Sequence, residues 1–155
     1  SLLSPQHMIA TPEGFEPARH LRLAINDITD PGAGSDPPAR IHADKLIAFG
    51  RSWDAQAPLL IHCWAGISRS MASAFTLLCD RATPGSENEI ALWLRTRARH
   101  ALPNALLVRH ADEVMGREGR MLAALHAMGA AEVRSEGILT EFPLAELPGP
   151  ARDQP

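Results

Sequence analysis

One ten-residue segment constrains this chain more than any other feature: Ile61-His-Cys-Trp-Ala-Gly-Ile-Ser-Arg-Ser70. The short apolar run Pro58–Ile61 leads into it, and no proline or glycine interrupts residues 70–78 after it. A short apolar run that follows a breaker is typical of a strand buried on both faces of a parallel sheet. The apolar residues of 70–78 share one helical face, which predicts a buried helix. We therefore expect a strand, a loop and a helix in direct succession.

The residues at the two ends of this loop, Cys63 and Arg69, suit an anion. A free cysteine thiol has a pKa of about 8.5, and the amides of a helix N-terminus together with a nearby arginine lower it to roughly 3.5 to 7.5. Cys63 lies a few residues before the expected helix, so those amides face its sulfur. We expect Cys63 to be a nucleophilic thiolate. Arg69 presents a planar fork of donors that matches two phosphate oxygens and stabilises the transition state more than the ground state.

The residues between them can form a phosphate-binding loop, because successive backbone amides can point into a common concavity. Gly66 can adopt the positive φ that such a concavity requires. The Ser70 hydroxyl is suited to bonding the sulfur as it leaves, and His62 is suited to supporting the loop by hydrogen bonding. Trp64 either lines a substrate pocket or covers the loop. The expected substrate-binding residues are Trp64, Ala65, Gly66, Ile67 and Ser68.

This pattern resembles the His-Cys-x5-Arg-Ser/Thr signature of the protein tyrosine phosphatase superfamily. The form Cys-x-Ala-Gly-x-Ser-Arg-Ser is closest to the dual-specificity branch, and similar small predicted phosphatases occur in bacteria. The specific match covers about Leu59 to Leu78, and a looser likeness in element order includes Leu102–Ala105. The resemblance implies an α/β fold with a central, mostly parallel sheet flanked by helices, and a phosphate loop between a central strand and a helix. It also implies a strand before Leu21.

The same resemblance implies a general acid, an aspartate on a loop upstream of the nucleophile. Residues 21–25 read as a strand, and Asn26-Asp27 follow directly, so Asp27 lies just past a strand end. The segment Ala24-Ile-Asn-Asp27 is similar to the dual-specificity pattern in which the acid ends such a segment. We expect Asp27 to be the general acid, with Asp30 and Asp36 as alternatives.

The rest of the chain reads as one domain over residues 1–142. Residues 29–38 are dense in proline and glycine and predict a loop. Helices are expected over four ranges: 39–53, 86–99 with a capping box at Ser86, 103–116 and 118–128. Residues 143–155 predict a proline-rich tail that wraps the surface and then frays. The apolar start without methionine is typical of a strand, so we expect the first strand to be truncated upstream.

The composition argues against several classes of partner. A net charge of -3 supplies no basic surface for a nucleic acid, and no stretch approaches the length of a membrane span. The seven histidines show no ligand spacing, so we expect neither metal nor cofactor. Arg95, Arg97, Arg99 and His100 are expected on a solvated surface. Cys79 is expected in the core, and two free thiols favour a reducing cytoplasm.

These observations predict a monomeric hydrolase that acts on a phosphorylated protein or a small phosphomonoester. The alternative is a phosphate-recognition module without turnover, because the loop alone would retain the anion. A rhodanese-type sulfurtransferase is disfavoured, since its common loop has four intervening residues and this one has five. No lysine or arginine lies between Cys63 and Arg69, which disfavours phosphoinositides. We expect phosphotyrosine or several phosphoamino acids as substrates.

Overall fold

The computed structural model describes residues 1–149, which form a mixed α/β fold of five α-helices and one small parallel sheet. The strands are β1 (Leu2–Leu3) and β2 (Leu23–Ala24). The helices are α1 (Arg40–Ser52), α2 (Arg69–Arg81), α3 (Glu87–Arg97), α4 (Ala105–Met115) and α5 (Arg120–Ala127). Short 3-10 helices lie at Pro5–His7, Pro17–Arg19 and Leu144–Glu146. Within residues 1–149, no helix has the length and apolar character needed to cross a membrane.

The two strands lie in the core and lead toward the motif. β1 and β2 pair in parallel, with Leu2 opposite Leu23, and both of these leucines are buried. On the other edge of β1, the amide of Leu2 donates to the carbonyl of His62 at 2.9 Å. Residues 59–62 therefore run beside β1, and the motif begins next to the sheet.

The strand predicted at Pro58–Ile61 is not present. In the described part of the chain, residues 58–61 make no backbone hydrogen bond to β1, whose amide bond from Leu2 goes to His62, and a strand needs repeated pairing. Leu60 is 71% exposed, so the run is not buried on both faces. The prediction failed because an apolar run does not by itself show whether its second face is covered.

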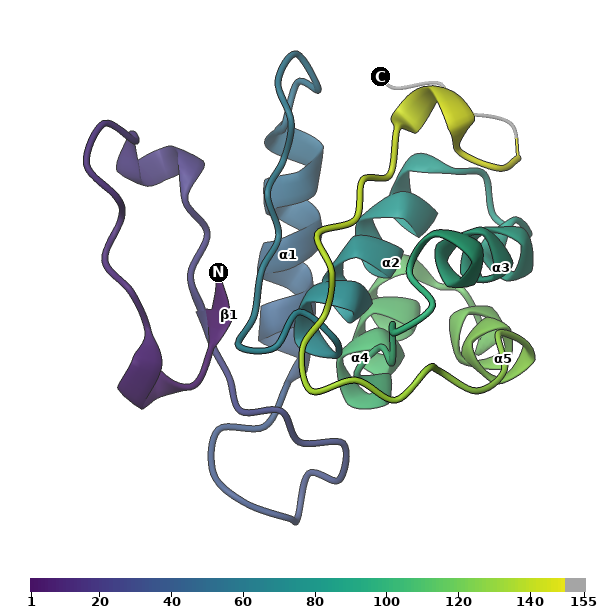
Figure 1. Cartoon of the computed structure of the whole chain (residues 1–155), viewed down its shortest axis with the longest axis horizontal. Coiled ribbons are helices and arrows are strands. Elements are labelled where there is room, and N and C mark those ends of the chain that lie inside the picture. Colours follow the sequence, from purple (N-terminus) through teal and green to yellow (C-terminus); the bar gives the residue numbers. More distant parts are fainter. Residues whose placement is uncertain (150–155) are drawn as a thin grey trace.

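α2 is the central helix of the fold. It packs against α1, α3 and α4, and Figure 1 shows it between α1 on one side and α3 with α5 on the other. Buried residues lie on all sides of the helix and not along one face only. Even its polar residues Ser73 and Thr76 are fully buried. A helix enclosed by neighbours on all sides holds its N-terminus rigidly. The predicted buried helix after the motif is confirmed.

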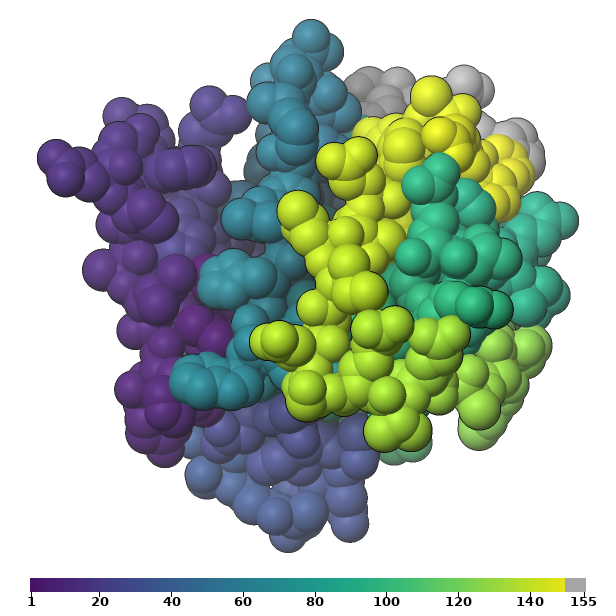
Figure 2. All heavy atoms as spheres, in the orientation of Figure 1, coloured from purple at the N-terminus to yellow at the C-terminus, as the bar shows by residue number. Residues whose placement is uncertain are grey.

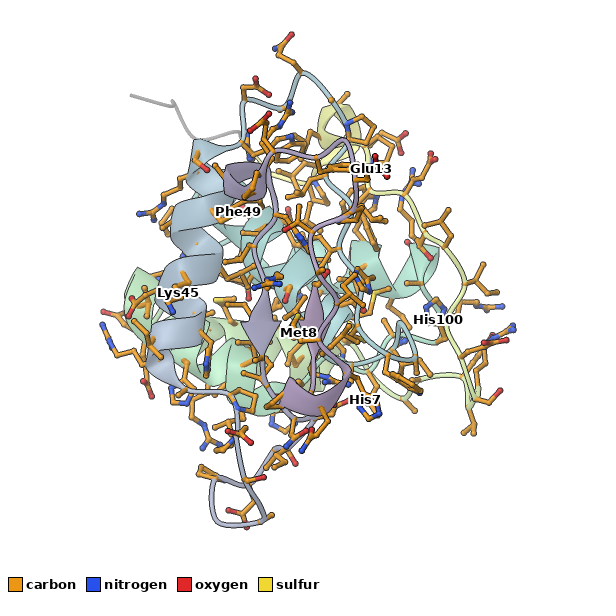
Figure 3. The ribbon with its side chains drawn as sticks, turned by 90° about the vertical axis from the view of Figure 1, so that its left-hand side faces the viewer. His7, Met8, Glu13, Lys45, Phe49 and His100 are labelled. Carbon is orange, nitrogen blue, oxygen red and sulfur yellow. The ribbon has the colours of Figure 1, made fainter. Side chains whose placement is uncertain are left out.

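α1 confirms the helix predicted over 39–53. The buried positions are Ala43, Leu46, Ile47 and Gly50, which follow helical spacing. Ile41, an apolar residue in the first turn, is instead 53% exposed. It lies on the same side of the helix as the exposed Lys45, one turn further along, which Figure 3 labels.

The remaining helices match their predicted ranges closely but not all of their predicted ends. Ser86 makes no side-chain capping bond at the start of α3, where Glu87 instead accepts a hydrogen bond from the amide of Gly85 at 2.9 Å. α4 begins at the N-cap Asn104 and ends at Gly116, whose φ of 62° is left-handed. The loop predicted over 29–38 is confirmed.

The segment after α5 turns back across the molecule. Figure 2 shows it in yellow-green, lying over the front face beside the green atoms of the α3 region. The partly buried Leu144 and Leu147 pack against the core. The rings of Phe142 and Trp93 meet edge-on, with their centroids 5.5 Å apart. Residues 143–149 thus wrap the surface as expected, and the predicted fraying falls on 150–155, outside the described residues.

Arg117 joins three helices and supplies a stability test. It is 1% exposed, and it donates to Glu87 at 2.8 Å and to the carbonyl of Cys79 at 2.6 Å. Arg117→Met leaves the buried Glu87 carboxylate without this partner, so we expect the free energy of unfolding to fall by about 3–5 kcal/mol in urea titrations. Arg99→Met, which removes an exposed pair with Glu132, should change it by less than about 1 kcal/mol. Equal effects of the two substitutions would contradict this prediction.

Candidate active site

The loop from Cys63 to Ser68 lies where residues 59–62 meet α2, beside the end of β2. The backbone after β2 reaches the loop directly, because the carbonyl of Ile25 accepts a hydrogen bond from Arg69 at 2.8 Å. The loop that carries Asp27 follows β2 at the same end of the molecule as the start of α2 (Figure 1). The motif therefore occupies the carboxyl end of the sheet, where open parallel sheets present their sites.

The backbone of the loop is turned so that its carbonyls point outward. The carbonyl of Ala65 accepts from the amide of Gly137 at 2.6 Å, and that of Ile67 accepts from Leu102 at 2.9 Å. In a planar trans peptide the carbonyl of one residue and the amide of the next point in opposite directions. The amides of Gly66 and Ser68 therefore point inward. Gly66 has a φ of 73°, the positive value that the sequence analysis expected of it.

The inward amides converge on Cys63, which is 7% exposed. Burial raises the pKa of the Cys63 thiol, but hydrogen bonds from the Ser70 hydroxyl and from the backbone amides of Ser70, Gly66 and Ser68 outweigh burial and lower its pKa below the ordinary value. The sulfur and the Ser70 hydroxyl oxygen lie 3.2 Å apart. The structure thus places the Cys63 sulfur among hydrogen-bond donors that favour its thiolate form.

Arg69 closes the loop and carries a buried donor that is available to a ligand. Its side chain is 8% exposed, and one terminal nitrogen, Nη1, donates to the carbonyl of Ile25. Its buried Nε has no hydrogen-bond partner among residues 1–149 and lies 3.9 Å from Oδ2 of Asp27. A buried guanidinium N–H without a partner is costly, so this donor favours an anion in the loop.

Asp27 is bonded directly to the loop. Its Oδ1 accepts from the Ser68 hydroxyl at 2.7 Å and from the amide nitrogen of Asn104 at 2.8 Å. Within residues 1–149, no hydrogen bond joins the carboxylate of Asp30 or Asp36 to the loop, and that of Asp30 accepts from the amide of Gly32 instead. Of the three candidate aspartates, the structure brings Asp27 to the loop.

The residues that flank Cys63 in sequence have different surroundings. Nε2 of His62 lies 2.6 Å from the Ser1 hydroxyl, and its backbone carbonyl bonds Leu2, so its ring ties the chain entering the loop to the residue before β1. Trp64 is 71% exposed and its ring packs against His7 with centroids 4.9 Å apart. Trp64 is therefore an exposed ring held against His7, next to Cys63 in the chain. Figure 3 shows His7 on the turn that follows β1.

His100 was expected on a solvated surface, and the structure shows it 3% exposed. It lies beside the segment that follows α5, as Figure 3 shows, and against the loop. A Cβ added to Gly137 would lie 2.6 Å from the carbonyl oxygen of Gly66 and 2.8 Å from Nε2 of His100. Only glycine allows this close approach. Arg95 is likewise not free, because it donates to the carbonyls of Met128, Ala98, Arg99 and Gly129.

Sequence reasoning missed three residues of the site: Asn104, His100 and Gly137. Asn104 had a signal, since an asparagine just before a helical pattern is a typical N-cap, but that signal said nothing of Asp27. His100 and Gly137 meet the loop only through tertiary contacts. Cys79 is 1% exposed and reduced, as expected of a core cysteine. Within residues 1–149, no group of three His, Cys, Asp or Glu side chains is placed to hold a metal ion.

The lowered pKa of Cys63 can be tested by alkylation. We expect iodoacetamide to modify Cys63 in the folded protein with a pH midpoint below the value of about 8.5 for a free thiol. Ser70→Ala should raise that midpoint, because it removes a hydrogen bond to the thiolate. Ser73→Ala is the control, since its hydroxyl bonds the carbonyl of Arg69 and not the sulfur. Cys79 should stay unmodified, because burial raises its pKa and excludes the reagent.

Mass spectrometry of the alkylated peptides distinguishes the two cysteines. A midpoint at or above the free-thiol value, or equal shifts in the two serine variants, would contradict the description of the loop as a thiolate site.

Comparisons of this chain with protein-family models, with curated proteins and with solved structures find no match. Inference about function therefore rests on the motif and on the geometry of its residues.

Proposed function

We propose that this protein is a cysteine-dependent phosphatase that hydrolyses phosphomonoesters through a phosphocysteine intermediate. The observation that carries the proposal is the convergence of three loop amides and the Ser70 hydroxyl on the sulfur of Cys63. A ring of inward amides around a thiolate is also a receptor for the oxygens of a phosphoryl group. Arg69 and Asp27 border the same loop, so a phosphate clamp and a proton donor are at hand.

In the first step the Cys63 thiolate attacks phosphorus. The S–P bond forms, the bond from phosphorus to the ester oxygen breaks, and protonated Asp27 gives its proton to the departing oxygen. The three equatorial phosphoryl oxygens carry the developing charge. The loop amides and the Nε–H of Arg69 stabilise that charge, which provides the difference between transition-state and ground-state binding.

In the second step water hydrolyses the phosphocysteine. The Asp27 carboxylate accepts a proton from the attacking water, the S–P bond breaks, and inorganic phosphate leaves. The electron pair returns to sulfur, and the Ser70 hydroxyl at 3.2 Å donates to the re-forming thiolate. Cys63 and Asp27 are then restored to their starting protonation states, so the cycle needs no cofactor.

The geometry of the rim supports an aromatic phosphate ester as substrate. Trp64 follows Cys63 in sequence, is exposed and packs against His7, which gives the rim of the loop an aromatic surface. No cation lies among residues 64–68 to bind further phosphates. We infer that a phosphorylated protein, on phosphotyrosine or on several phosphoamino acids, or a small phosphomonoester is the substrate.

We infer a tyrosine-phosphatase-like fold with a sheet flanked by helices, supported by the motif and by the adjacency of β2, β1 and residues 59–62. We also infer that the protein acts as a monomer. We infer a reducing cytoplasm as its compartment, because Cys63 works as a free thiolate. The net charge of -3 supports a protein or small-molecule partner over a nucleic acid or a membrane surface.

The proposal is tested by hydrolysis of an aryl phosphate over a pH series. Cys63→Ser should abolish turnover. Asp27→Asn should lower kcat by about 10²–10⁴-fold, the usual contribution of a general acid. Activity requires Cys63 ionised and Asp27 protonated, so the wild-type rate should fall at both low and high pH. Asp27→Asn should lose the fall at high pH, because no acid remains to be deprotonated.

Asp30→Asn is the matched control and should keep the wild-type pH profile. Loss of the high-pH limb in Asp30→Asn instead of Asp27→Asn would overturn the assignment of the acid. A wild-type protein that binds vanadate but shows no turnover would overturn the phosphatase activity, and the phosphate-recognition module would take its place.

A further inference from the structure

The carboxamide of Asn104 links the start of α4 to the candidate acid. Asn104 is 1% exposed, and its Oδ1 accepts the amide of Leu107 at 3.0 Å, which caps the helix. Its Nδ2 donates to Oδ1 of Asp27 at 2.8 Å and to the carbonyl of Ile28 at 3.1 Å. Since the cap requires an acceptor, the oxygen must face the helix and the nitrogen must face Asp27.

The backbone of Asn104 is held as firmly as its side chain. Its amide donates to the carbonyl of Ser68 at 3.3 Å, and the Ser68 hydroxyl also bonds Asp27. Asn104, Ser68 and Asp27 therefore form a closed triangle of hydrogen bonds between α4, the phosphate loop and the loop after β2. A closed network of this kind holds each member in one rotamer.

The two oxygens of the Asp27 carboxylate are not equivalent. Oδ1 receives two donors, from Ser68 and Asn104, which occupy both of its lone pairs. A proton on Oδ1 would have to displace one of these neutral donors. Oδ2 receives no hydrogen bond within the described chain and faces the loop, 3.9 Å from Nε of Arg69. Within residues 1–149, the charged side chain that contacts this carboxylate is that of Arg69, on α2.

We propose that Asn104 is a positioning residue for the general acid: it holds Asp27 so that Oδ2 carries the transferable proton beside the phosphate loop. This inference rests on the proposed phosphatase activity and adds a residue to it. Asn104 does not touch the substrate, and it acts through Asp27. Its effect should therefore appear only where the departing oxygen needs a proton.

The dependence of the rate on the leaving group tests this role. Phenyl phosphate releases a basic oxygen that needs protonation, whereas 4-nitrophenyl phosphate releases a stable phenolate that needs it much less. Asn104→Ser keeps a residue suited to the N-cap but is too short to reach Asp27. We expect it to lower kcat/KM for phenyl phosphate by about 10²-fold, the cost of roughly 1 Å of misplacement, and for 4-nitrophenyl phosphate by much less.

Coupling to Asp27 is tested with the double variant. If Asn104 acts only through Asp27, Asn104→Ser should cause no further loss for phenyl phosphate in the Asp27→Asn background. Asn88→Ser, an exposed asparagine on α3, is the matched control and should leave both substrates unchanged. The alkylation midpoint of Cys63 should also stay unchanged in Asn104→Ser, which shows an intact phosphate loop. Should Asn104→Ser fail to fold, Asn104→Asp retains the cap and lacks the donor.

The outcomes separate the two proposals. Equal losses for both esters, no loss for either, or an additive loss in the double variant would overturn the positioning role while the phosphatase activity stands. No turnover of either ester by the wild-type protein would overturn the activity itself, and the positioning role with it. A selective loss for phenyl phosphate that disappears in the Asp27→Asn background would establish Asn104 as the residue that positions the acid.

Discussion

The site depends on the outward-facing carbonyls of the phosphate loop. Ala65, Ile67 and Ser68 bond amides from the segment 102–104 and from Gly137, all far along the chain. The bonds to Ala65 and Ile67 turn the amides of Gly66 and Ser68 inward, because a trans peptide holds its carbonyl and amide in opposite directions. The lowered pKa of the thiol at the centre of the loop is therefore a consequence of backbone packing as much as of the residues in the motif.

The helix that carries the loop, α2, is itself held by buried polar contacts. Its N-terminus carries the loop, while at its other end Arg117 bonds both the carbonyl of Cys79 and the carboxylate of Glu87. A helix enclosed on all sides cannot shift without disturbing several neighbours, since protein interiors are close-packed. Rigidity of α2 keeps the loop amides in register with the sulfur of Cys63, as electrostatic preorganisation requires.

The parts of the site predicted from sequence are those that depend on short spacing. Cys63 and Gly66 lie a few residues before α2 and Ser70 lies in its first turn, so local geometry determines where they meet. Asp27 came from the resemblance to the dual-specificity branch together with a predicted strand end, and in the structure its carboxylate accepts a hydrogen bond from Ser68. The prediction that His100 lies on a solvated surface was wrong. A histidine just after a helix gives no sign, in the sequence, of a distant chain segment that returns to cover it.

Taken alone, the sequence determined the positions of the helices, the loop between residues 63 and 69, and the chemistry available there, because capping residues, helical periodicity and motif spacing are local properties. Tertiary structure decided which segments hold that loop, that residues 58–61 form no regular strand, and that Asn104 meets Asp27. These features join parts of the chain that are distant in sequence. Their geometry follows from how the helices pack around α2, which no local pattern records.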